Sequence, residues 1–347
     1  MTDTIYRAAI VGLGYIGGAD QVSGDALGQL VQDLDGTHFY AMRNHPRVKL
    51  VAGSSRDAGR RQRFTERSSL PTYTSWQEML EREQLDIVSV ATYTPQHAEI
   101  TEACAKQGVR VIFCEKPIAS TVSDAERMLA VCKQVGSLLA VNHNRRFDLN
   151  FRRLRDLVAS GQLGDLTSAS IQWGSGRLGN VGTHMFNALC MLTGRRVEAV
   201  SATLDSAGRP DCRGTQFHDP GGWGVLLLEG GLMTVFDAAD YGAIPGAITL
   251  NGTKGRATTG VGDVSLEFWD GTKDHWPQTS DQESSMDRAM GKIVAWLDGE
   301  AAFPDPPENS LHTLEVIAGC HASHRRNTAW TPLPLQDEDR ETVVGSG

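Results

Sequence analysis

The sequence predicts an α/β protein of two domains, a doubly wound parallel sheet followed by a mostly antiparallel sheet that is open on one face. The length of 347 residues corresponds to about two domains. Strand and helix patterns alternate over residues 1–145, whereas helical periodicity largely disappears between about 165 and 280. The hydrophobic content of 40% and the charged content of 22% are ordinary for a globular protein.

The parallel sheet is predicted from short apolar runs separated by helical patterns. The expected strands cover 6–11, 48–52, 86–92, 109–114 and 138–142. The expected helices cover 64–67, 76–83, 97–107 and 123–134. Gly108 and Gly136 follow two of these helices, and Ser123 with Glu126 forms a capping-box pattern. Strands that alternate with helices imply a parallel sheet with helices on both faces.

The second region is predicted from stretches in which apolar and polar residues alternate. The expected strands cover 166–173, 197–204, 224–228, 232–238, 247–251 and 264–269, with turns at Asn251-Gly252 and Asp270-Gly271. Helices are expected at 184–192 and, after a proline-rich break at 303–307, at 311–324. The predicted domains are therefore 1–145, 146–310, and a C-terminal helix and tail, 311–347, that packs back on the chain.

The most informative motif lies at the end of the first expected strand. Residues 9–17 read AIVGLGYIG, which places Gly12, Gly14 and Gly17 in the pattern G-x-G-x-x-G. In such a motif the glycines allow a tight turn, close approach of the backbone to a pyrophosphate, and close packing of helix on strand. Because a chain with 37 glycines contains such triplets by chance, the position between strand and helix carries the prediction of a Rossmann dinucleotide site.

The end of the second expected strand bears on the choice of cofactor. An NAD site typically places an acidic side chain there for the ribose 2′-hydroxyl. Ser55 occupies that place and Arg56 follows it, which suits a 2′-phosphate because a guanidinium offers paired donors and a fixed charge. The interpretation favours NADP over NAD, although Asp57 would serve NAD if the register were shifted by two residues.

An unusually long segment separates the glycine motif from Ser55. Gly17 and Ser55 are 38 residues apart, against about 20 in the usual pattern. The excess is assigned to residues 19–36, a polar stretch that contains Asp20, Asp25, Asp33 and Asp35. It either covers the cofactor or the substrate entrance, or it is a surface insertion without a role.

Composition excludes several classes of protein. A net charge of −9 argues against nucleic acid as a partner. A basic cluster is interpreted as a solvated helix face because acids interrupt it; it comprises Arg145, Arg146, Arg152, Arg153 and Arg155. No apolar run of about 18 residues predicts a membrane span, and no signal-peptide pattern is present. The six scattered cysteines suggest reduced thiols in a cytoplasmic protein. His321 and His324 have no third ligand nearby, so no metal is expected.

Four segments in a specific order resemble one enzyme family. They are 12–17 (GLGYIG), 91–97 (ATYTPQH), 114–117 (CEKP) and 182–184 (GTH). On these motifs the chain resembles the Gfo/Idh/MocA family, named for glucose–fructose oxidoreductase, inositol dehydrogenase and a rhizopine-catabolism protein. The resemblance extends from about residue 6 to 335, and Glu-Lys-Pro after a strand is its most specific element.

The resemblance implies a Rossmann domain, a second domain with a large open antiparallel sheet, and NAD(P)-dependent redox chemistry on sugars, polyols or related cyclic compounds. It also implies a homodimer or homotetramer formed through the open sheet. It places Lys116 near the nicotinamide and the reacting hydroxyl. The family motif Asp-x-x-x-His, with a further Asp three residues later, corresponds here to Asn180, His184 and Asn187. Both acids are thus replaced by asparagine, which bears on any Lys–Asp–His relay and on the substrate.

The chemistry itself indicates roles for two residues. Oxidation of a secondary alcohol requires removal of the hydroxyl proton as hydride leaves carbon, and a positioned base typically contributes about 10²–10⁴-fold. An imidazole titrates near neutrality, so His184 is assigned as the general acid/base. Lys116 is assigned to stabilise the developing alkoxide; the reverse assignment, with Lys116 as base, stays open. Asn180 cannot ionise, so it only donates or accepts hydrogen bonds.

The candidate site residues form two groups. The cofactor-binding group is Gly12, Gly14, Tyr15, Ile16, Ser54, Ser55, Arg56, Thr92, Tyr93, Thr94, His97, Glu115, Lys116 and Arg145. The substrate-binding group is Lys116, Trp173, Arg177, Asn180 and His184. Two of these have structural alternatives, since His97 is also expected to cap its helix and Trp173 to pack in the core. Trp223, Trp269 and Trp276 are expected to pack on the second sheet.

Two other classes of function remain open. The replacement of both acids is compatible with a sensor that binds a dinucleotide and a metabolite without catalysis. The retention of Lys116 and His184 argues against that reading. A lyase, hydrolase or transferase that oxidises a sugar transiently is the third possibility.

Overall fold

The computed structural model describes residues 4–22, 36–205, 218–240, 244–260, 262–278 and 283–346. The chain divides into two compact units. The first comprises residues 1–119, 124–144 and 281–308, and the second comprises 120–123, 145–280 and 309–347. Cys212 and the acids Asp25, Asp33 and Asp35 of the long segment lie outside the described residues.

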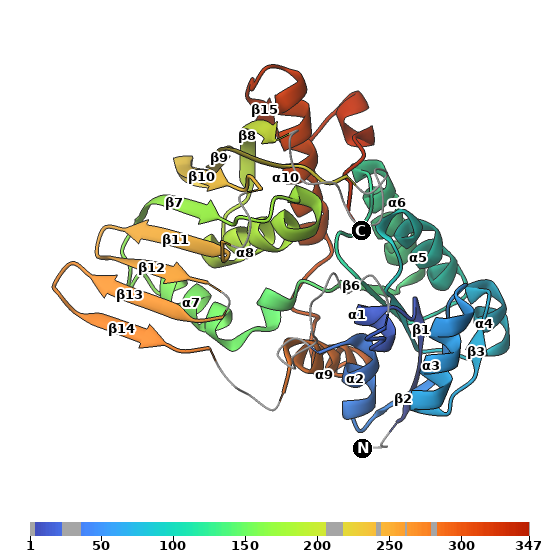
Figure 1. Ribbon diagram of the computed structural model, residues 1–347. Coiled ribbons are helices and arrows are strands. Elements are labelled where there is room, and N and C mark those ends of the chain that lie inside the picture. The colour runs from blue at the N-terminus through green and yellow to red at the C-terminus, as the bar shows by residue number, and fades with distance from the viewer. Residues whose placement is uncertain are drawn as a thin grey trace. The chain divides into compact units, whose positions relative to one another are not determined.

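The sheet of the first unit has six strands in the order β3-β2-β1-β4-β5-β6, and every neighbouring pair is parallel (Figure 1). The strands are β1 (Tyr6–Val11), β2 (Val48–Ser54), β3 (Thr72–Tyr73), β4 (Ile87–Val90), β5 (Val111–Cys114) and β6 (Leu138–Val141). All residues of β4 and β5 are buried, as expected where helices cover both faces. The predicted parallel sheet is therefore confirmed, with β3 as an additional edge strand.

Within the described residues, six helices connect these strands in order. They are α1 (Tyr15–Gly18), α2 (His38–Asn44), α3 (Ala58–Ser68), α4 (Trp76–Arg82), α5 (His97–Lys106) and α6 (Val122–Val135). Gly108 and Gly136 adopt positive φ angles of 83° and 76° just beyond α5 and α6, as predicted for residues that end a helix. The predicted cap at Ser123 is wrong, because α6 already begins at Val122 and the Ser123 hydroxyl donates to Glu341 instead.

A seventh helix, α9 (Ser285–Leu297), returns to the first unit from the sequence region expected in the second domain. Polar contacts explain the difference, since Asn44 Nδ2 donates to Asp287 Oδ1 at 3.1 Å. Just beyond the helix, the Asp298 carboxylate accepts from Nη1 and Nη2 of Arg47 at 2.5 and 2.6 Å and from the Tyr6 hydroxyl at 2.6 Å. Residues from β1 and from the α2–β2 connection thus hold the end of α9.

The sheet of the second unit has nine strands in the order β14-β13-β12-β11-β7-β10-β9-β8-β15. The strands are β7 (Leu166–Gln172), β8 (Val197–Asp205), β9 (Gly221–Leu228), β10 (Leu232–Asp237), β11 (Ala247–Gly252), β12 (Gly255–Thr259), β13 (Val264–Phe268), β14 (Lys273–Trp276) and β15 (Thr331–Pro332). All neighbours are antiparallel except β7 and β10, which confirms a mostly antiparallel sheet. The turn expected at Asn251-Gly252 lies further on, because β11 continues through Gly252 and β12 begins at Gly255.

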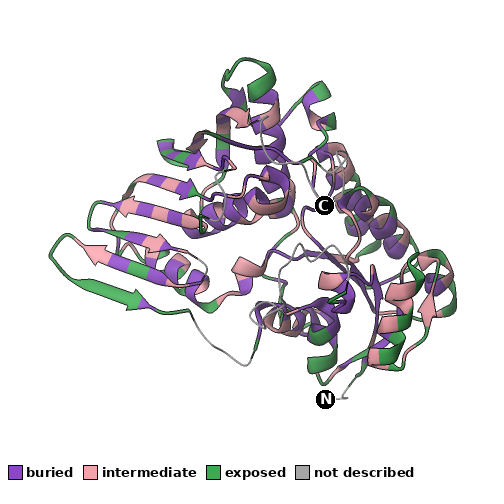
Figure 2. Ribbon diagram, in the orientation of Figure 1, coloured by how far each residue is buried: buried purple, intermediate pink, exposed green. Residues whose placement is uncertain are grey.

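Helices α7 (Leu149–Ala159), α8 (Thr183–Thr193) and α10 (Glu308–Arg325) belong to the second unit. Helix α10 lies along β8, where His312 Nε2 accepts from Val197 N at 3.0 Å and Ser323 Oγ accepts from Ala202 N at 2.9 Å. Burial alternates along β10 and β11, so one face of the sheet is covered and the other is open (Figure 2). In α7, Phe151, Leu154 and Leu157 are buried, whereas the three arginines of the helix, Arg152, Arg153 and Arg155, are half-exposed or exposed. The expected solvated helix face therefore holds for these three only, because Arg145 and Arg146 lie before the helix in a 3₁₀ turn.

The tryptophans of this sheet differ from their expected positions. Trp276 is buried, but Trp223 and Trp269 are 45% and 53% exposed. Trp223 lies opposite Asp237 in the β9–β10 pair, on the face that also carries Val225 and Val235. The prediction that it packs on the sheet is wrong, since strand alternation places it on the open face. None of the helices in the described ranges combines the length and apolar character needed to cross a membrane.

Candidate functional site

The turn between β1 and α1 contains glycines at positions where a larger residue would not fit. Gly12 has a φ of +102°, and a Cβ atom there would lie 2.3 Å from the Ala91 carbonyl oxygen. A Cβ on Gly17 would lie 2.0 Å from the carbonyl oxygen of Gly12. The bare backbone therefore lies directly against the end of β4, at the point where strand order reverses in the sheet. This arrangement suits the pyrophosphate of a dinucleotide, and Gly14, Tyr15 and Ile16 lie at the start of α1 beside it.

The end of β2 shows which side chains are available to a ribose. Ser54 is buried and its carbonyl accepts from Gly12 N at 2.9 Å. Asp57 Oδ1 accepts from Arg60 N at 2.7 Å and caps α3. Arg61 donates to the carbonyl oxygens of Ser55 and Arg56 at 2.6 and 2.9 Å, which fixes the backbone at this point. Arg56 itself is exposed, so its guanidinium is accessible to a ligand.

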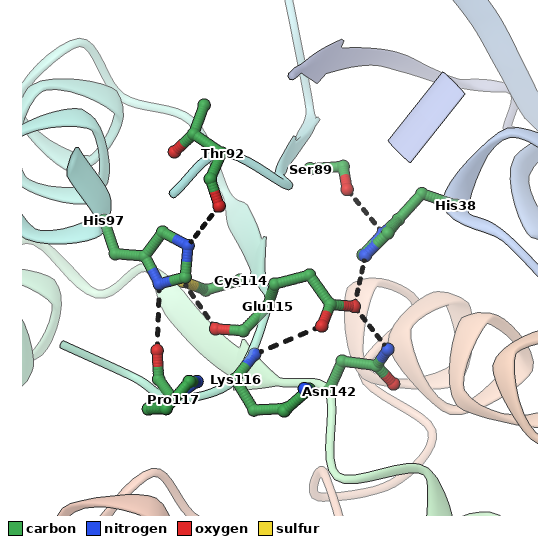
Figure 3. Close-up of polar contacts among 9 residues, drawn as sticks. All are labelled: His38, Ser89, Thr92, His97, Cys114, Glu115, Lys116, Pro117 and Asn142. Carbon is green, nitrogen blue, oxygen red and sulfur yellow. Dashed lines mark hydrogen bonds and ion pairs between the residues drawn. The ribbon is translucent and has the colours of Figure 1, made fainter. Parts of the chain in front are cut away.

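The segment after β4 is tied to the segment after β5 through His97. Thr92 and Tyr93 lead into a 3₁₀ turn, Thr94–Gln96, before α5. The His97 ring is buried, with Nε2 3.0 Å from Thr92 O and Nδ1 2.9 Å from Pro117 O (Figure 3). Burial lowers the pKa of His97. The expectation that His97 caps its helix is wrong, because Gln96 is the cap residue and the imidazole bridges two loops instead.

Glu115, directly after β5, is the centre of a buried polar cluster. Its Oε1 accepts from His38 Nε2 at 3.0 Å and from Asn142 Nδ2 at 2.6 Å, and its Oε2 accepts from the backbone N of Lys116 at 3.3 Å (Figure 3). The Ser89 hydroxyl contacts the other ring nitrogen of His38. Burial alone would raise the pKa of Glu115, but the His38 hydrogen bond and charge, together with Lys116 and Asn142, lower it to about 2. The carboxylate is therefore ionised at neutral pH.

Three members of this cluster were absent from the predicted site. His38 follows the long segment after the glycine motif, so no familiar spacing identifies it. Ser89 lies within a buried strand and Asn142 directly follows β6, and neither position differs in sequence from an ordinary core residue. A polar residue at the end of a parallel strand was the one available signal, and it applies to Asn142.

In the second unit, the predicted substrate residues surround a π-helical turn, Leu178–Gly182, that leads into α8. Asp219 accepts from the backbone N atoms of Gly179 and Asn180 at 2.8 and 2.7 Å. The side chains of Asn180 and His184 are half-buried, and Arg177 begins the turn with a φ of +60°. Asp219 thus fixes the backbone that carries the candidate residues, a role that no sequence motif indicates.

The remaining predicted residues of the second unit have structural partners. Trp173 is 1% exposed and its Nε1 donates to Gly176 O at 2.6 Å, in agreement with the core-packing alternative. Asn187 Oδ1 accepts from Arg146 Nε at 2.6 Å, and its Nδ2 donates to Thr313 at 3.0 Å. The Arg145 guanidinium lies 5.9 Å from the centre of the Phe151 ring. Asn187 therefore serves to hold Arg146.

The structure assigns the predicted residues to two sets. The first set lies at the carboxyl ends of β1, β2, β4 and β5 and comprises the glycine turn, Ser54–Arg56, Thr92–His97, and Glu115 with Lys116. The second unit contains Arg145, Trp173, Arg177, Asn180 and His184. Over the described part of the chain, no group of three His, Cys, Asp or Glu side chains is arranged to hold a metal.

The strand order, the glycine turn and the polar groups at one sheet edge define the first unit as a Rossmann dinucleotide-binding domain. Residues 6–143 match the family model described as "Oxidoreductase family, NAD-binding Rossmann fold". The match covers the N-terminal domain, and it agrees with the resemblance to the Gfo/Idh/MocA family seen in the sequence motifs.

Curated relatives match parts of the chain. Myo-inositol 2-dehydrogenase of Thermotoga maritima is 37% identical over 92 residues, which cover 26% of this chain and 27% of the relative. Trans-1,2-dihydrobenzene-1,2-diol dehydrogenase of Mus musculus is 25% identical over 228 residues, which cover 60% of this chain and 66% of the relative. Each match thus spans less than two thirds of the relative's own length.

Solved structures share the fold of both units. The WlbA dehydrogenase of Bordetella pertussis, in complex with NADH and UDP-GlcNAcA, has a TM-score of 0.79 at 20% identity and covers 97% of this chain and 100% of its own. An inositol dehydrogenase homologue of Azotobacter vinelandii, in complex with NADH and myo-inositol, has a TM-score of 0.77 at 18% identity, with 95% and 98% covered. At this level of identity the comparison establishes the fold.

Proposed function

We propose that the protein is an NAD(P)-dependent oxidoreductase that transfers hydride between a nicotinamide cofactor and a secondary hydroxyl or ketone of a sugar, a polyol or a related cyclic compound. The observation that carries this proposal is the position of Lys116. It directly follows the buried, ionised Glu115 at the carboxyl end of β5, within a domain that belongs to a family of NAD-binding oxidoreductases. The names of the relatives, an inositol and a diol dehydrogenase, support a hydroxylated substrate.

Lys116 is proposed to stabilise negative charge on the substrate oxygen. The nearby Glu115 carboxylate has no proton to give at neutral pH, and its charge favours the ammonium form of a neighbouring amine. A fixed positive charge at a developing alkoxide stabilises the transition state more than the neutral alcohol. This supports the role of electrostatic stabiliser over that of general base for Lys116.

His184 is proposed to exchange the hydroxyl proton. Its position in the first turn of α8 is supported by the π-helical turn that Asp219 holds, so the imidazole is carried on a fixed backbone. An imidazole both accepts and returns a proton near neutral pH, which suits either direction of reaction. Asn180 is proposed to hydrogen-bond a substrate hydroxyl, and Arg177 to contact the substrate as well.

The cofactor supplies the hydride acceptor or donor when it is bound. The residues proposed to hold it are those of the glycine turn, Ser54–Arg56, Thr92–His97, Glu115 with Lys116, and Arg145. NADP is favoured because Asp57, the acid that would serve NAD, already caps α3, while Arg56 is exposed. The favoured assembly is a homodimer or homotetramer formed through the open face of the second sheet.

The proposal is tested by a cofactor-reduction screen at 340 nm with NAD and NADP separately and a panel of hexoses, polyols, inositols and glycosides. On the substrate that reacts, we expect Lys116→Met and His184→Gln each to lower kcat about 10²–10⁴-fold. Dinucleotide affinity should remain within a few-fold in His184→Gln, because that residue is assigned to proton transfer.

Two substitutions of exposed residues serve as matched controls. Lys49→Met removes a charge from the surface of β2, and His275→Gln removes an exposed imidazole from β14. Both should retain wild-type turnover. Activity that survives in Lys116→Met and in His184→Gln would refute the assigned roles. Tight dinucleotide binding without turnover of any compound would instead favour the sensor.

A further inference from the structure

The side-chain carbonyl of Asn142 is a buried acceptor at the edge of the Glu115 cluster. Asn142 directly follows β6, is 5% exposed, and its backbone N donates to Cys114 O at 2.9 Å. Its Nδ2 donates to Glu115 Oε1 at 2.6 Å. No group among the described residues donates to its Oδ1.

The orientation of this amide is fixed by its neighbour. The ionised Glu115 carboxylate only accepts hydrogen bonds, so the amide nitrogen of Asn142 must face it. The flipped amide would place two acceptor oxygens against each other while His38 and the Lys116 backbone already donate to the same carboxylate. Oδ1 is consequently turned away from Glu115, as Figure 3 shows.

A buried acceptor without a donor is costly, and native proteins rarely retain one without a reason. The position of Asn142 indicates what the donor is. Gly12 ends β1 and Ser55 follows β2, so the pyrophosphate and the adenosine side of a dinucleotide belong to this half of the sheet. The other mononucleotide half, β4 to β6, then receives the nicotinamide and its ribose, and Asn142 lies at its carboxyl end.

We propose that Asn142 binds the nicotinamide half of the cofactor, with its Oδ1 accepting a hydrogen bond from the carboxamide N–H. The carboxamide and the ribose hydroxyls are the hydrogen-bond donors on that half, and both present the same chemistry to a carbonyl oxygen. A contact to the carboxamide fixes the rotation of the ring, so Asn142 is a positioning residue for the reacting carbon. This inference rests on the dinucleotide-binding part of the proposed function.

The test is equilibrium binding measured by calorimetry, independent of turnover. Wild-type protein and Asn142→Leu are titrated with the preferred cofactor, NADP or NAD, and with its 3-acetylpyridine analogue, in which a methyl ketone replaces the amide and removes the N–H. We expect Asn142→Leu to bind the natural cofactor about tenfold more weakly, as for the loss of one buried hydrogen bond. Binding of the analogue should remain unchanged, so the discrimination between the two should disappear.

His38→Leu is the matched control, because it removes a different donor from the same Glu115 oxygen and leaves Asn142 Oδ1 in place. If Asn142 acted only by supporting Glu115, both variants would weaken all ligands alike, and the proposal would be overturned. Asn142→Ala repeats the measurement with a smaller side chain, and its circular dichroism shows that the protein is folded.

Two shorter ligands, ADP-ribose and ADP, distinguish the remaining outcomes. Weaker binding of the natural cofactor, its analogue and ADP-ribose, with ADP unchanged, would support the contact but assign the donor to the ribose hydroxyls. Unchanged binding of every ligand would overturn the proposal and leave the oxygen to a water molecule. Failure of wild-type protein to bind ADP or either cofactor would instead reject the proposed function itself.

Discussion

At the end of β2, two adjacent residues with different side chains decide what the site offers to an adenosine ribose. Ser55 supplies a small hydroxyl and Arg56 an exposed guanidinium, while the Asp57 carboxylate is engaged by the first turn of α3. Arg61 binds the carbonyl oxygens of both Ser55 and Arg56, so the backbone here is held in place before any ligand arrives. A guanidinium carried on a backbone that is already held binds a phosphate without the cost of ordering the loop.

We predict that Arg56→Ala weakens NADP about 10- to 100-fold, the effect of losing charge-assisted hydrogen bonds to a phosphate. NAD affinity should change less than about twofold, because NAD has no group for this side chain to bind. Fluorescence titration with NADPH and with NADH measures the two dissociation constants. Lys49→Ala on the same strand controls for the loss of one positive charge. An equal loss for both cofactors would contradict the 2′-phosphate interpretation.

At the scale of elements, the start of α8 depends on a residue about 40 positions away in the chain. The Asp219 carboxylate accepts from two backbone N–H groups in the π-helical turn. It thereby does the work that a neighbouring N-cap side chain does in other helices. Gly182, the residue before α8, has helical φ and ψ angles and makes no side-chain cap. The helix that carries His184 is therefore fixed by a tertiary contact.

We predict that Asp219→Ala destabilises the protein by about 2 kcal/mol, because one buried and one partly buried N–H group lose a charged acceptor. Activity should fall as well, since the turn that supports His184 loosens. Urea denaturation followed by tryptophan fluorescence measures the first effect, and steady-state kinetics the second. Asp219→Asn keeps one oxygen acceptor and should lie between wild type and Asp219→Ala. If Asp219→Ala kept wild-type stability and wild-type activity, the turn would be held by other contacts.

At the scale of the molecule, the second sheet presents an apolar face to solvent. Met233 and Val235 on β10 are 41% and 54% exposed, and Trp223 on β9 is 45% exposed. Strand register places these three side chains on one face with Val225 and Leu227. A contiguous apolar patch of this kind is typical of an interface, which supports the proposed oligomer.

We predict that Val235→Lys weakens self-association at least about 100-fold, because it introduces an unpaired charge into an apolar contact. Light scattering coupled to size-exclusion chromatography measures the mass over a range of concentrations. Val343→Lys changes another exposed valine outside the sheet and should leave the mass unaltered. A monomeric wild-type protein, or an unchanged mass for Val235→Lys, would exclude this face as the interface.

Much of the architecture was predictable because it follows from local patterns. Buried parallel strands are continuous apolar runs, and β1, β2, β4, β5 and β6 all appear where such runs were expected. The glycine turn was likewise identifiable, since Gly12 and Gly17 are required by steric contacts within a short β1–α1 unit. In contrast, α2 and α9 were not predicted, although Ser284 and Asp287 form a capping box before α9. Helix α2 has only seven residues, and both helices bury one face, so their stability depends on packing.

By itself the sequence determined the class of the N-terminal domain and most strands of both sheets, because apolar periodicity and glycine spacing act over a few residues. It did not predict β3, β12, β14 or β15. Only the tertiary structure decided that His97 bridges two loops, that Asp219 supports the turn before His184, and that Asn142 turns its carbonyl away from an ionised Glu115. These contacts join residues from 5 to 40 positions apart in the sequence. Their energy comes from burial and from the partner's charge, and neither quantity exists until the chain has folded.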